Sequence, residues 1–321
     1  MLAGLGQPDP RVILGPQLGE DAAAIAFGDR CLVVTTDPVT FATDRIGWYA
    51  VHVNANDIAA MGATPRWLFV VLLLPEQDTT TALVDAIMRD VHDTSAALGI
   101  TVCGGHTEVT TGLDRPIVVG QMLGDVACDR LVKKTGLEVG DQIILTQGIA
   151  IEGTALLARE KRAALDGQVA DDVLVRAEQF LFDPGISVVT AARTALDAGT
   201  VHAMHDPTEG GLVSGLYELA VASSTGLHVQ GDRVHVFPET EAVCRPLGVD
   251  PMRLLASGAL LIGAPVADTD HIVAALDAQG TPAGVIAEVR PASAGLAIEH
   301  DGVTSALQPA ERDEIARVFE G

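Results

Sequence analysis

Apolar runs alternate with helix-period segments through the first half of the chain. The densest apolar run, Trp67–Leu74, has the length and composition of a buried strand. The first helical segment is followed by Gly62 and then Pro65, which is typical of a helix C-terminus. The pattern predicts strands at 31–36, 67–74, about 100–103 and 116–123, and helices at about 46–61 and from the Thr79–Thr81 cluster to Gly99.

A polar, glycine-containing turn at Gly136–Asp141 interrupts this pattern. We expect a domain boundary there, with an N-terminal domain of 1–138 and a C-terminal domain of 139–321. The second half again mixes both periods, so the sequence predicts an α+β fold in two halves. Its predicted strands are 142–147, 226–230, 258–263 and 283–289, and its predicted helices are 152–161, 170–181, 186–198 and Pro207–Ser223.

Charge narrows the classes of partner. The chain has 20 basic and 43 acidic residues and a net charge of −23, and only three of its basic residues are lysines. So acidic a chain argues against binding nucleic acid or an anionic membrane surface. No segment has the ~18–20 apolar residues of a membrane helix. A salt-rich cytosol and GC-rich codon usage are competing explanations for the composition, and the sequence does not decide between them.

The cysteines and the N-terminus favour a cytoplasmic protein. Four scattered cysteines form no C-x-x-C pair, so a zinc knuckle or a redox motif is not expected and a reduced compartment is the simple interpretation. Met1–Pro10 is neither basic nor apolar, so we expect no secretory signal.

Acidic clusters fall at or near the ends of predicted elements. Their residues are candidates for Mg²⁺, which prefers carboxylates together with substrate phosphates. Neighbouring glycines would let backbone N–H groups approach phosphate oxygens. The alternatives are a turn or cap role for each Asp, a solvated helix position for Asp57 and a plain turn at Gly104-Gly105. The clusters are Gly19–Ala23, Thr35–Asp37, Asn54–Asp57 and Gly104–Glu108.

A fifth cluster, His205–Gly211, admits two compatible interpretations. Asp206 as N-cap, Pro207 at the first helical position and Glu209 two residues later form a capping box. Alternatively, the N–H groups of this helix start face an anion. Capping does not explain the pair Gly210-Gly211, because glycine in a first turn costs stability.

In this order the segments GEDAA, TTD, NANDIAAMGATP, GGHTEV and DPTEGGL resemble the AIR synthase-like (PurM-like) superfamily. DPTEGGL followed by LLASGALLIGAP is most similar to the HypE-like branch. The resemblance implies a two-domain PurM-like fold, a homodimer paired through the N-terminal domain, and ATP bound with Mg²⁺. It implies metal ligands at Asp21, Asp37 and Asp57. The residues it implies for the nucleotide and its phosphates are Asn56, Gly104, Gly105, His106, Thr107, Asp206, Gly210 and Gly211.

Two departures from the superfamily affect the expected reaction. His106 stands where the family usually has an aspartate, so it would contact phosphate rather than replace a hard oxygen ligand, or Glu108 would take over. HypE-type proteins carry a C-terminal cysteine that accepts a carbamoyl group, whereas here Cys244 is the last cysteine and the sequence ends at Gly321. We therefore expect a reaction other than dehydration on a tail thiol.

The expected function is ATP-dependent activation of an oxygen atom in a small substrate by phosphoryl transfer, with the acceptor unidentified. A thiamine-monophosphate kinase-like enzyme is one alternative, although PVTFATDRIGW after Asp37 lacks the stretch usual in that branch. A non-catalytic nucleotide-binding scaffold is the other. A homodimer is also expected because the strands Trp67–Leu74 and Ile117–Leu123 are too apolar to be left exposed.

Overall fold

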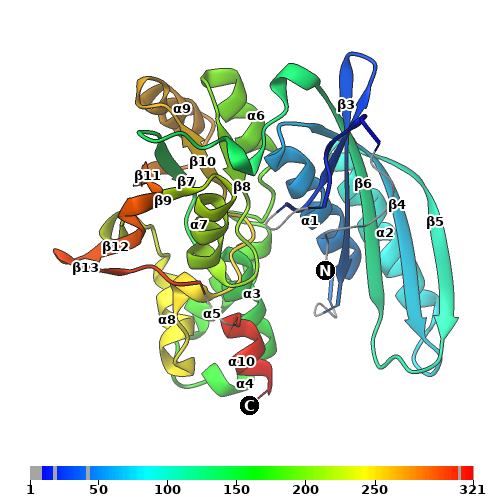
Figure 1. Cartoon of the computed structure of the whole chain (residues 1–321). Helices are drawn as coiled ribbons and strands as arrows, with labels where there is room; N and C mark the ends of the chain where they lie inside the picture. Colours follow the sequence, from blue (N-terminus) through cyan, green and yellow to red (C-terminus); the bar gives the residue numbers. More distant parts are fainter. Residues whose placement is uncertain (1–8, 17–19, 41–43, 310–311, 321) are drawn as a thin grey trace. The chain divides into compact units, whose positions relative to one another are not determined.

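The computed structural model describes residues 9–16, 20–40, 44–309 and 312–320 (Figure 1). The chain divides into two compact units, Met1–Leu131 and Val132–Gly321. Each unit has one sheet and its own helices, so both are of the α+β class. No helix within these ranges combines the length and the apolar character that crossing a membrane requires.

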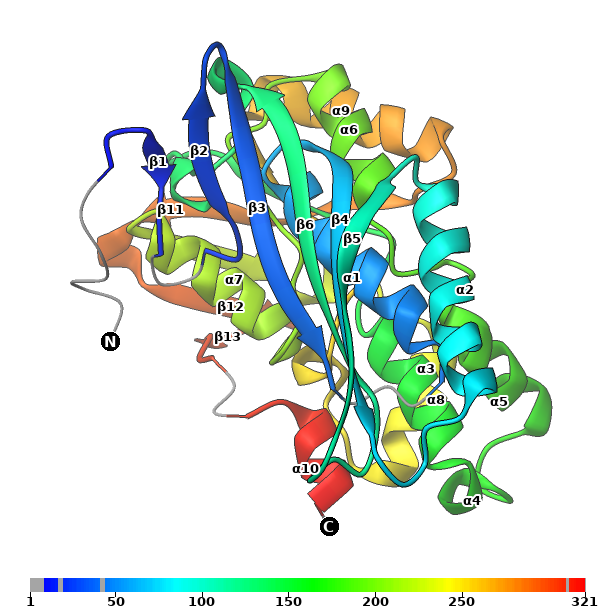
Figure 2. The ribbon, with the colours of Figure 1, turned by 90° about the vertical axis from the view of Figure 1, so that its right-hand side faces the viewer.

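The N-terminal unit is a six-stranded sheet of order β1-β2-β3-β6-β4-β5. Its strand pairs are antiparallel except β4 and β5, which are parallel and are connected through helix α2. Helices α1 and α2 lie side by side on one face of the sheet (Figure 2). The elements are β1 Val12–Leu14, β2 Ala23–Phe27, β3 Arg30–Val39, α1 Ile46–Ala60, β4 Thr64–Pro75, α2 Thr81–Ala97, β5 Thr101–Thr110 and β6 Ile117–Ala127.

Two glycines of β6 allow α1 to approach the sheet closely. A Cβ atom on Gly120 would lie 2.4 Å from Nδ2 of Asn54, and one on Gly124 would lie 2.3 Å from Cγ2 of Ile58. Since real Cβ contacts are never this short, larger residues at either position would push the helix away. The close packing fixes where the polar side chains of α1 lie relative to β3.

Strand β5 is longer than the sequence pattern predicts. It continues through Gly104–Glu108 to Thr110 and pairs with β4, so the plain-turn interpretation of Gly104-Gly105 is wrong. It lies at the edge of the sheet, and every residue from Thr101 to Val109 is exposed. The segment expected to follow a strand is therefore the second half of one.

The C-terminal unit is a seven-stranded sheet of order β13-β12-β9-β11-β7-β10-β8. Helices α6 and α9 pack together, α9 contacts β7 and β11, and α7 contacts β8 and β9. Helices α3, α5 and α8 share a second buried cluster. The strands are β7 Gln142–Thr146, β8 Ala203–His205, β9 Thr225–Gln230, β10 Leu261–Ala264, β11 Ala283–Pro291, β12 Leu296–His300 and β13 Val303–Ala306. The helices are α3 Ile151–Glu160, α4 Arg162–Leu165, α5 Asp171–Glu178, α6 Val189–Ala198, α7 Gly211–Ala222, α8 Pro238–Leu247, α9 Val266–Ala278 and α10 Glu314–Glu320.

The start of α7 and the pairing of two cysteines also differ from the sequence-based expectations. Helix α7 begins at Gly211 rather than at Pro207. Cys31 of β3 and Cys128, just after β6, form a disulfide across 97 residues of sequence. The cysteine spacing does not predict this pair, because it arises from the pairing of β3 with β6, in which Cys31 lies opposite Val126.

Candidate functional site

The hydroxyl of Thr35 is the centre of an oxygen-rich site in the N-terminal unit. Thr35 Oγ1 lies 2.7 Å from Oδ2 of Asp57, 3.2 Å from Oδ2 of Asp37 and 2.9 Å from the carbonyl oxygen of Asp21. Its single hydrogen can be donated to only one of these acceptors at a time. Because the carboxylate oxygens of Asp57 and Asp37 both contact this one hydroxyl oxygen, they lie less than 6 Å from each other. Strand β3 and helix α1 thus bring together two of the three predicted metal ligands.

Asn54 of α1 fixes the position of Asp37. Its Oδ1 accepts the N–H of Asp37 at 3.1 Å, and its Nδ2 donates to the carbonyl of Ala50 at 2.8 Å. Asn54 is fully buried, so it is held rigidly beneath the acidic pair. The sequence placed Asn54 in this cluster without predicting its contact with Asp37.

The three acidic residues of this site differ in their exposure to solvent. Asp57 is 6% exposed and Asn56 is 1% exposed, so the interpretation of Asp57 as a solvated helix position is wrong. Asp37 is half-buried, and Asp21 is exposed. The atoms that could coordinate a metal here are carboxylate, hydroxyl and carbonyl oxygens, the hard ligands that Mg²⁺ prefers. The set fits a Mg²⁺ ion that also keeps water and phosphate ligands.

The remaining N-terminal candidates lie on the edge strand β5. Gly104, Gly105, His106 and Thr107 are all exposed. His106, which stands where the family usually has an aspartate, has its Nε2 atom 3.9 Å from Oε2 of Glu108. The two side chains therefore lie close together on the same side of the strand. Their role in nucleotide binding stays a prediction.

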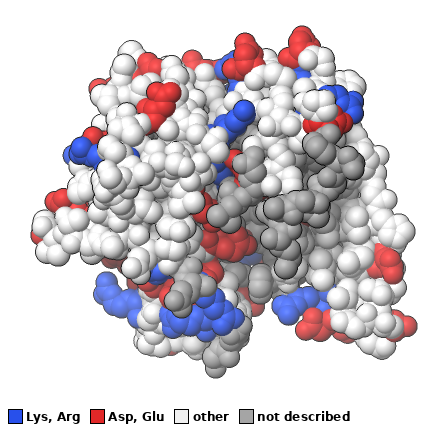
Figure 3. Space-filling model, viewed as in Figure 1, with Lys and Arg blue, Asp and Glu red and all other residues white. Residues whose placement is uncertain are grey.

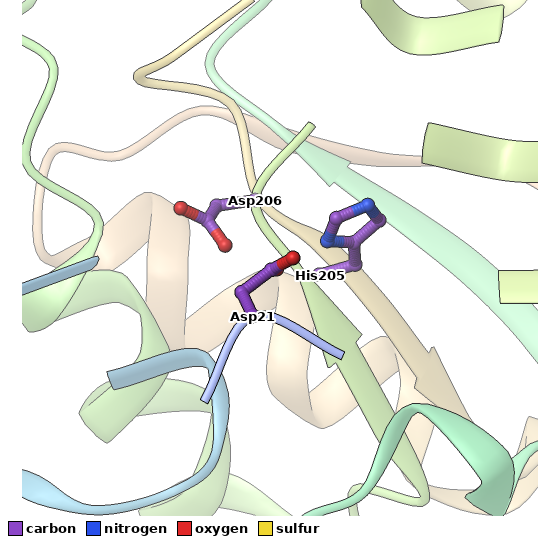
Figure 4. A group of neighbouring side chains, drawn as sticks. All are labelled: Asp21, His205 and Asp206. Atoms are coloured by element: carbon purple, nitrogen blue, oxygen red, sulfur yellow. The ribbon is translucent and has the colours of Figure 1, made fainter. Parts of the chain in front are cut away.

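In the C-terminal unit, the candidate segment His205–Gly211 begins at the last residue of β8. Figure 4 shows the side chains of His205 and Asp206 leaving the backbone in different directions. His205 Nε2 lies 2.7 Å from Oε2 of Glu218 on α7. Asp206 is 4% exposed, and its carbonyl oxygen accepts the hydroxyl of Thr208 at 3.1 Å.

Asp206 is not the N-cap of the following helix. Gly210 is the N-cap of α7, with a φ of 73°, and its N–H donates to Oδ2 of Asp313 at 2.6 Å. The other oxygen of Asp313 accepts the N–H of Ile315 at 2.7 Å. The capping-box interpretation is wrong, because a carboxylate from the C-terminal end of the chain caps α7.

Backbone geometry explains the glycine pair. Gly210 and Gly211 both have a positive φ, 73° and 64°. A Cβ atom on Gly211 would lie 2.7 Å from the carbonyl oxygens of Met252 and Leu254. Gly211 therefore requires glycine for the fold itself, and the left-handed backbone at Gly210 favours glycine there, whatever the loop binds.

A buried carboxyl group near this loop gives no signal in the sequence. Glu152, in the first turn of α3, is 8% exposed. Its pKa is raised to about 7, chiefly by burial; the charges of Glu209 and Asp313 also raise this pKa, and a hydrogen bond from Ser257 opposes the rise. Two neighbouring carboxyl groups thus act on the buried carboxyl group of Glu152.

Family models divide the chain in the same order as its two units. The model of the AIR synthase related protein N-terminal domain matches residues 19–126, and that of the C-terminal domain matches 138–297. The chain belongs to the AIR synthase related family. The first match contains Asp21, Asp37 and Asp57, and the second contains the segment from His205 to Gly211.

Known members of the AIR synthase related family resemble the chain over most of its length. The carbamoyl dehydratase HypE of Rhodobacter capsulatus is 29% identical over 87% of this chain and 78% of its own. The structure of a hydrogenase maturation protein HypE in complex with ATP superposes with a TM-score of 0.76 at 22% identity, covering 98% of this chain and 91% of that one. That of AaThiL with AMPPCP and TMP has a TM-score of 0.73 at 18% identity, over 92% and 90%. The fold is therefore the two-domain PurM-like fold.

Proposed function

We propose that this AIR synthase related protein binds Mg–ATP and activates an oxygen atom of a small substrate by phosphoryl transfer. The observation that carries the proposal is the Thr35 site, where Asp37 and Asp57 share one hydroxyl. Phosphoryl transfer depends on positioning and charge neutralisation more than on covalent catalysis. The nucleotides in the HypE and ThiL structures support the choice of ATP.

Each candidate residue has a role in this proposal. Asp21, Asp37 and Asp57 hold Mg²⁺, which would neutralise phosphate charge during the transfer. Thr35 positions Asp37 and Asp57, and Asn54 positions Asp37, through the contacts already described. Asn56, Gly104, Gly105, His106 and Thr107 contact the nucleotide, and Asp206, Gly210 and Gly211 contact its phosphates. A cytoplasmic location accords with the use of ATP.

Asp37→Asn and Asp57→Asn are expected to weaken Mg–ATP binding at least tenfold, because each removes a charged metal ligand. ATP without Mg²⁺ should bind the variants and the parent alike. Calorimetric titration with and without Mg²⁺ measures both effects. Asp114→Asn, at an exposed position of the same unit, is the matched control.

Parental affinity of both variants for Mg–ATP would show that these carboxylates do not hold the metal. If the parent binds Mg–ATP but forms no ADP with any oxygen acceptor, the chain is a nucleotide-binding scaffold instead. Phosphorylation of thiamine monophosphate would select the kinase alternative.

A homodimer through the N-terminal unit is part of the proposal. Strands β4 and β5 expose large apolar side chains, with Trp67 37%, Phe69 38%, Val102 37% and Val109 53% exposed. Strand β5 is also an open edge, which soluble proteins usually cover. Light scattering is expected to give twice the chain mass of 33.3 kDa at micromolar concentration. A single chain mass over the whole range would contradict the dimer.

Charge on the surface accords with a small-molecule substrate rather than a nucleic acid or a membrane. On the face drawn in Figure 3, acidic and basic side chains form small groups among uncharged residues. With a net charge of −23, the chain as a whole repels polyanions.

A further inference from the structure

A pocket of about 380 Å³ lies within the C-terminal unit, formed by three segments. The first segment, at the end of β7, contributes Leu145 and Gln147, and the second, which follows β9, contributes Arg233 and His235. The third, at the start of β11, contributes Pro282, Ala283, Gly284 and Ile286. This volume is in the range of small-molecule sites. None of these residues belongs to the proposed phosphoryl-transfer site.

The charge of the pocket is opposite to that of the chain. Its lining contains an arginine and a histidine but no acidic residue, although the chain has 43 aspartates and glutamates. Asp232, next to Arg233, is turned to another element. Its oxygens lie 3.3 Å from Nδ1 of His300 and 3.0 Å from the N–H of Asp301. Within the described ranges, no ion pair involves Arg233.

The walls of the pocket are fixed by the backbone. Gln147 has a φ of 59°, a conformation that side-chain-bearing residues seldom adopt. Its N–H donates to the carbonyl of Pro282 at 2.5 Å, which ties the end of β7 to the start of β11. A register shift between Val285 and Ala287 interrupts the pairing of β11 with β7 beside Ile286. The pocket is therefore largely formed without a ligand.

Apolar groups make up the rest of the lining. Leu145, Pro282, Ala283 and Ile286 supply carbon surface, and Gly284 leaves space. A Cβ atom on Gly284 would meet no atom within 4 Å. A ligand thus finds apolar carbon surface together with a guanidinium group and an imidazole ring in one pocket.

We propose that this pocket binds a small organic anion, a carboxylate or a phosphate monoester carried on a compact apolar body. Arg233 would bind the anionic group, since its planar guanidinium matches both carboxylate and phosphate oxygens. His235 would add a hydrogen bond, and its ring is oriented by an edge contact with Phe237 at 4.8 Å between centroids. The apolar body would lie over Gly284.

The test is calorimetric titration of the full chain with benzoate and with phenyl phosphate, and with benzyl alcohol as the neutral analogue. At least one of the two anions is expected to bind, at least tenfold more tightly than benzyl alcohol. Binding of benzoate alone or of phenyl phosphate alone identifies which anionic group the pocket takes. Arg233→Gln is expected to weaken that binding at least tenfold. Arg193→Gln, at an arginine that is also exposed and forms no ion pair with any described residue, should leave binding unchanged.

Gly284→Val tests the position of the site independently of charge. Valine would occupy the open space over the strand, so anion binding should be lost while the melting temperature is retained. If this variant does not fold, Arg233→Gln alone decides the matter, because Arg233 is exposed and its loss does not disturb the core. The proposal is overturned if neither anion binds, if benzyl alcohol binds as tightly, or if the Arg233 variant binds like the parent.

Discussion

Glu152→Gln is expected to stabilise the protein by about 3 kcal/mol above pH 8 and to leave its stability unchanged below pH 4. The pKa of Glu152 rises from its ordinary value of 4.5 to about 7 in the folded protein, chiefly because the carboxyl group is buried. The folded state therefore holds a proton that the unfolded state releases between these two pKa values. Stability of the parent falls as pH rises through this window, and glutamine removes that loss.

Denaturant unfolding of parent and variant from pH 4 to pH 8.5 measures this difference. The difference in stability between parent and variant should begin to grow above pH 4.5, where the unfolded carboxyl group titrates. It should become constant at pH values above about 7. Glu160→Gln, at an exposed position in the last turn of the same helix, is the matched control and should show no such gap. A gap that is constant from pH 4 upwards would mean that Glu152 titrates normally.

Cys31→Ser is expected to cost about 4 kcal/mol of stability in protein purified without reductant. The disulfide from Cys31 to Cys128 closes a loop of 97 residues. By removing conformational entropy, a cross-link of this span raises the free energy of the unfolded chain by about 4–5 kcal/mol. Reductant should lower the stability of the parent to a similar extent. It should leave the stability of the serine variant unchanged.

Thiol labelling provides the direct measurement. Under denaturing conditions, unreduced parent should react at two thiols, Cys103 and Cys244, and reduced parent at all four. Cys103→Ser is the matched control, because Cys103 is an exposed free thiol on the edge strand. Four reactive thiols in unreduced protein would show that the pair is not joined. The protein would then accord with the reduced compartment expected from the scattered cysteines.

Elements with local end signals were predictable from the sequence. Helix α2 begins where the Thr79–Thr81 cluster indicates, because the hydroxyl of Thr80 accepts the N–H of Leu83 at 3.2 Å. It is followed by Gly99, which has a positive φ of 69°. Such caps involve residues within one turn, so their pattern is visible in the sequence.

The start of α7 was not predictable in this way. Asp206, Pro207 and Glu209 have the spacing of a capping box, yet the N–H that needs a cap belongs to Gly210 and is bound by Asp313, 103 residues away. A local pattern cannot reveal a partner that only the tertiary fold supplies. The length of β5 was not predictable for a similar reason. Pairing with β4 extends this strand through two glycines, which by themselves favour neither helix nor strand.

The candidate metal site was partly predictable. The sequence indicates Asp37 and Asp57 as candidates because their carboxylates lie near the ends of predicted elements. In the structure both contact Thr35. The positioning contact from Asn54 depends on the absence of a side chain at Gly120, on a different strand. Glu152 lies in an ordinary helical sequence, so nothing but its burial distinguishes it from the other 42 acidic residues.

The glycines at 210 and 211 also constrain how this sequence can diverge. Every single-nucleotide change of a glycine codon that alters the residue adds at least a Cβ atom, and Gly211 has carbonyl oxygens 2.7 Å from that position. Selection for folding alone would therefore keep Gly211 even in descendants that lack the proposed nucleotide binding. Under the proposed function, retention of Gly211 in a distant homologue would indicate only the turn before α7, whereas loss of Asp37 or Asp57 there would indicate that the proposed metal binding had been lost.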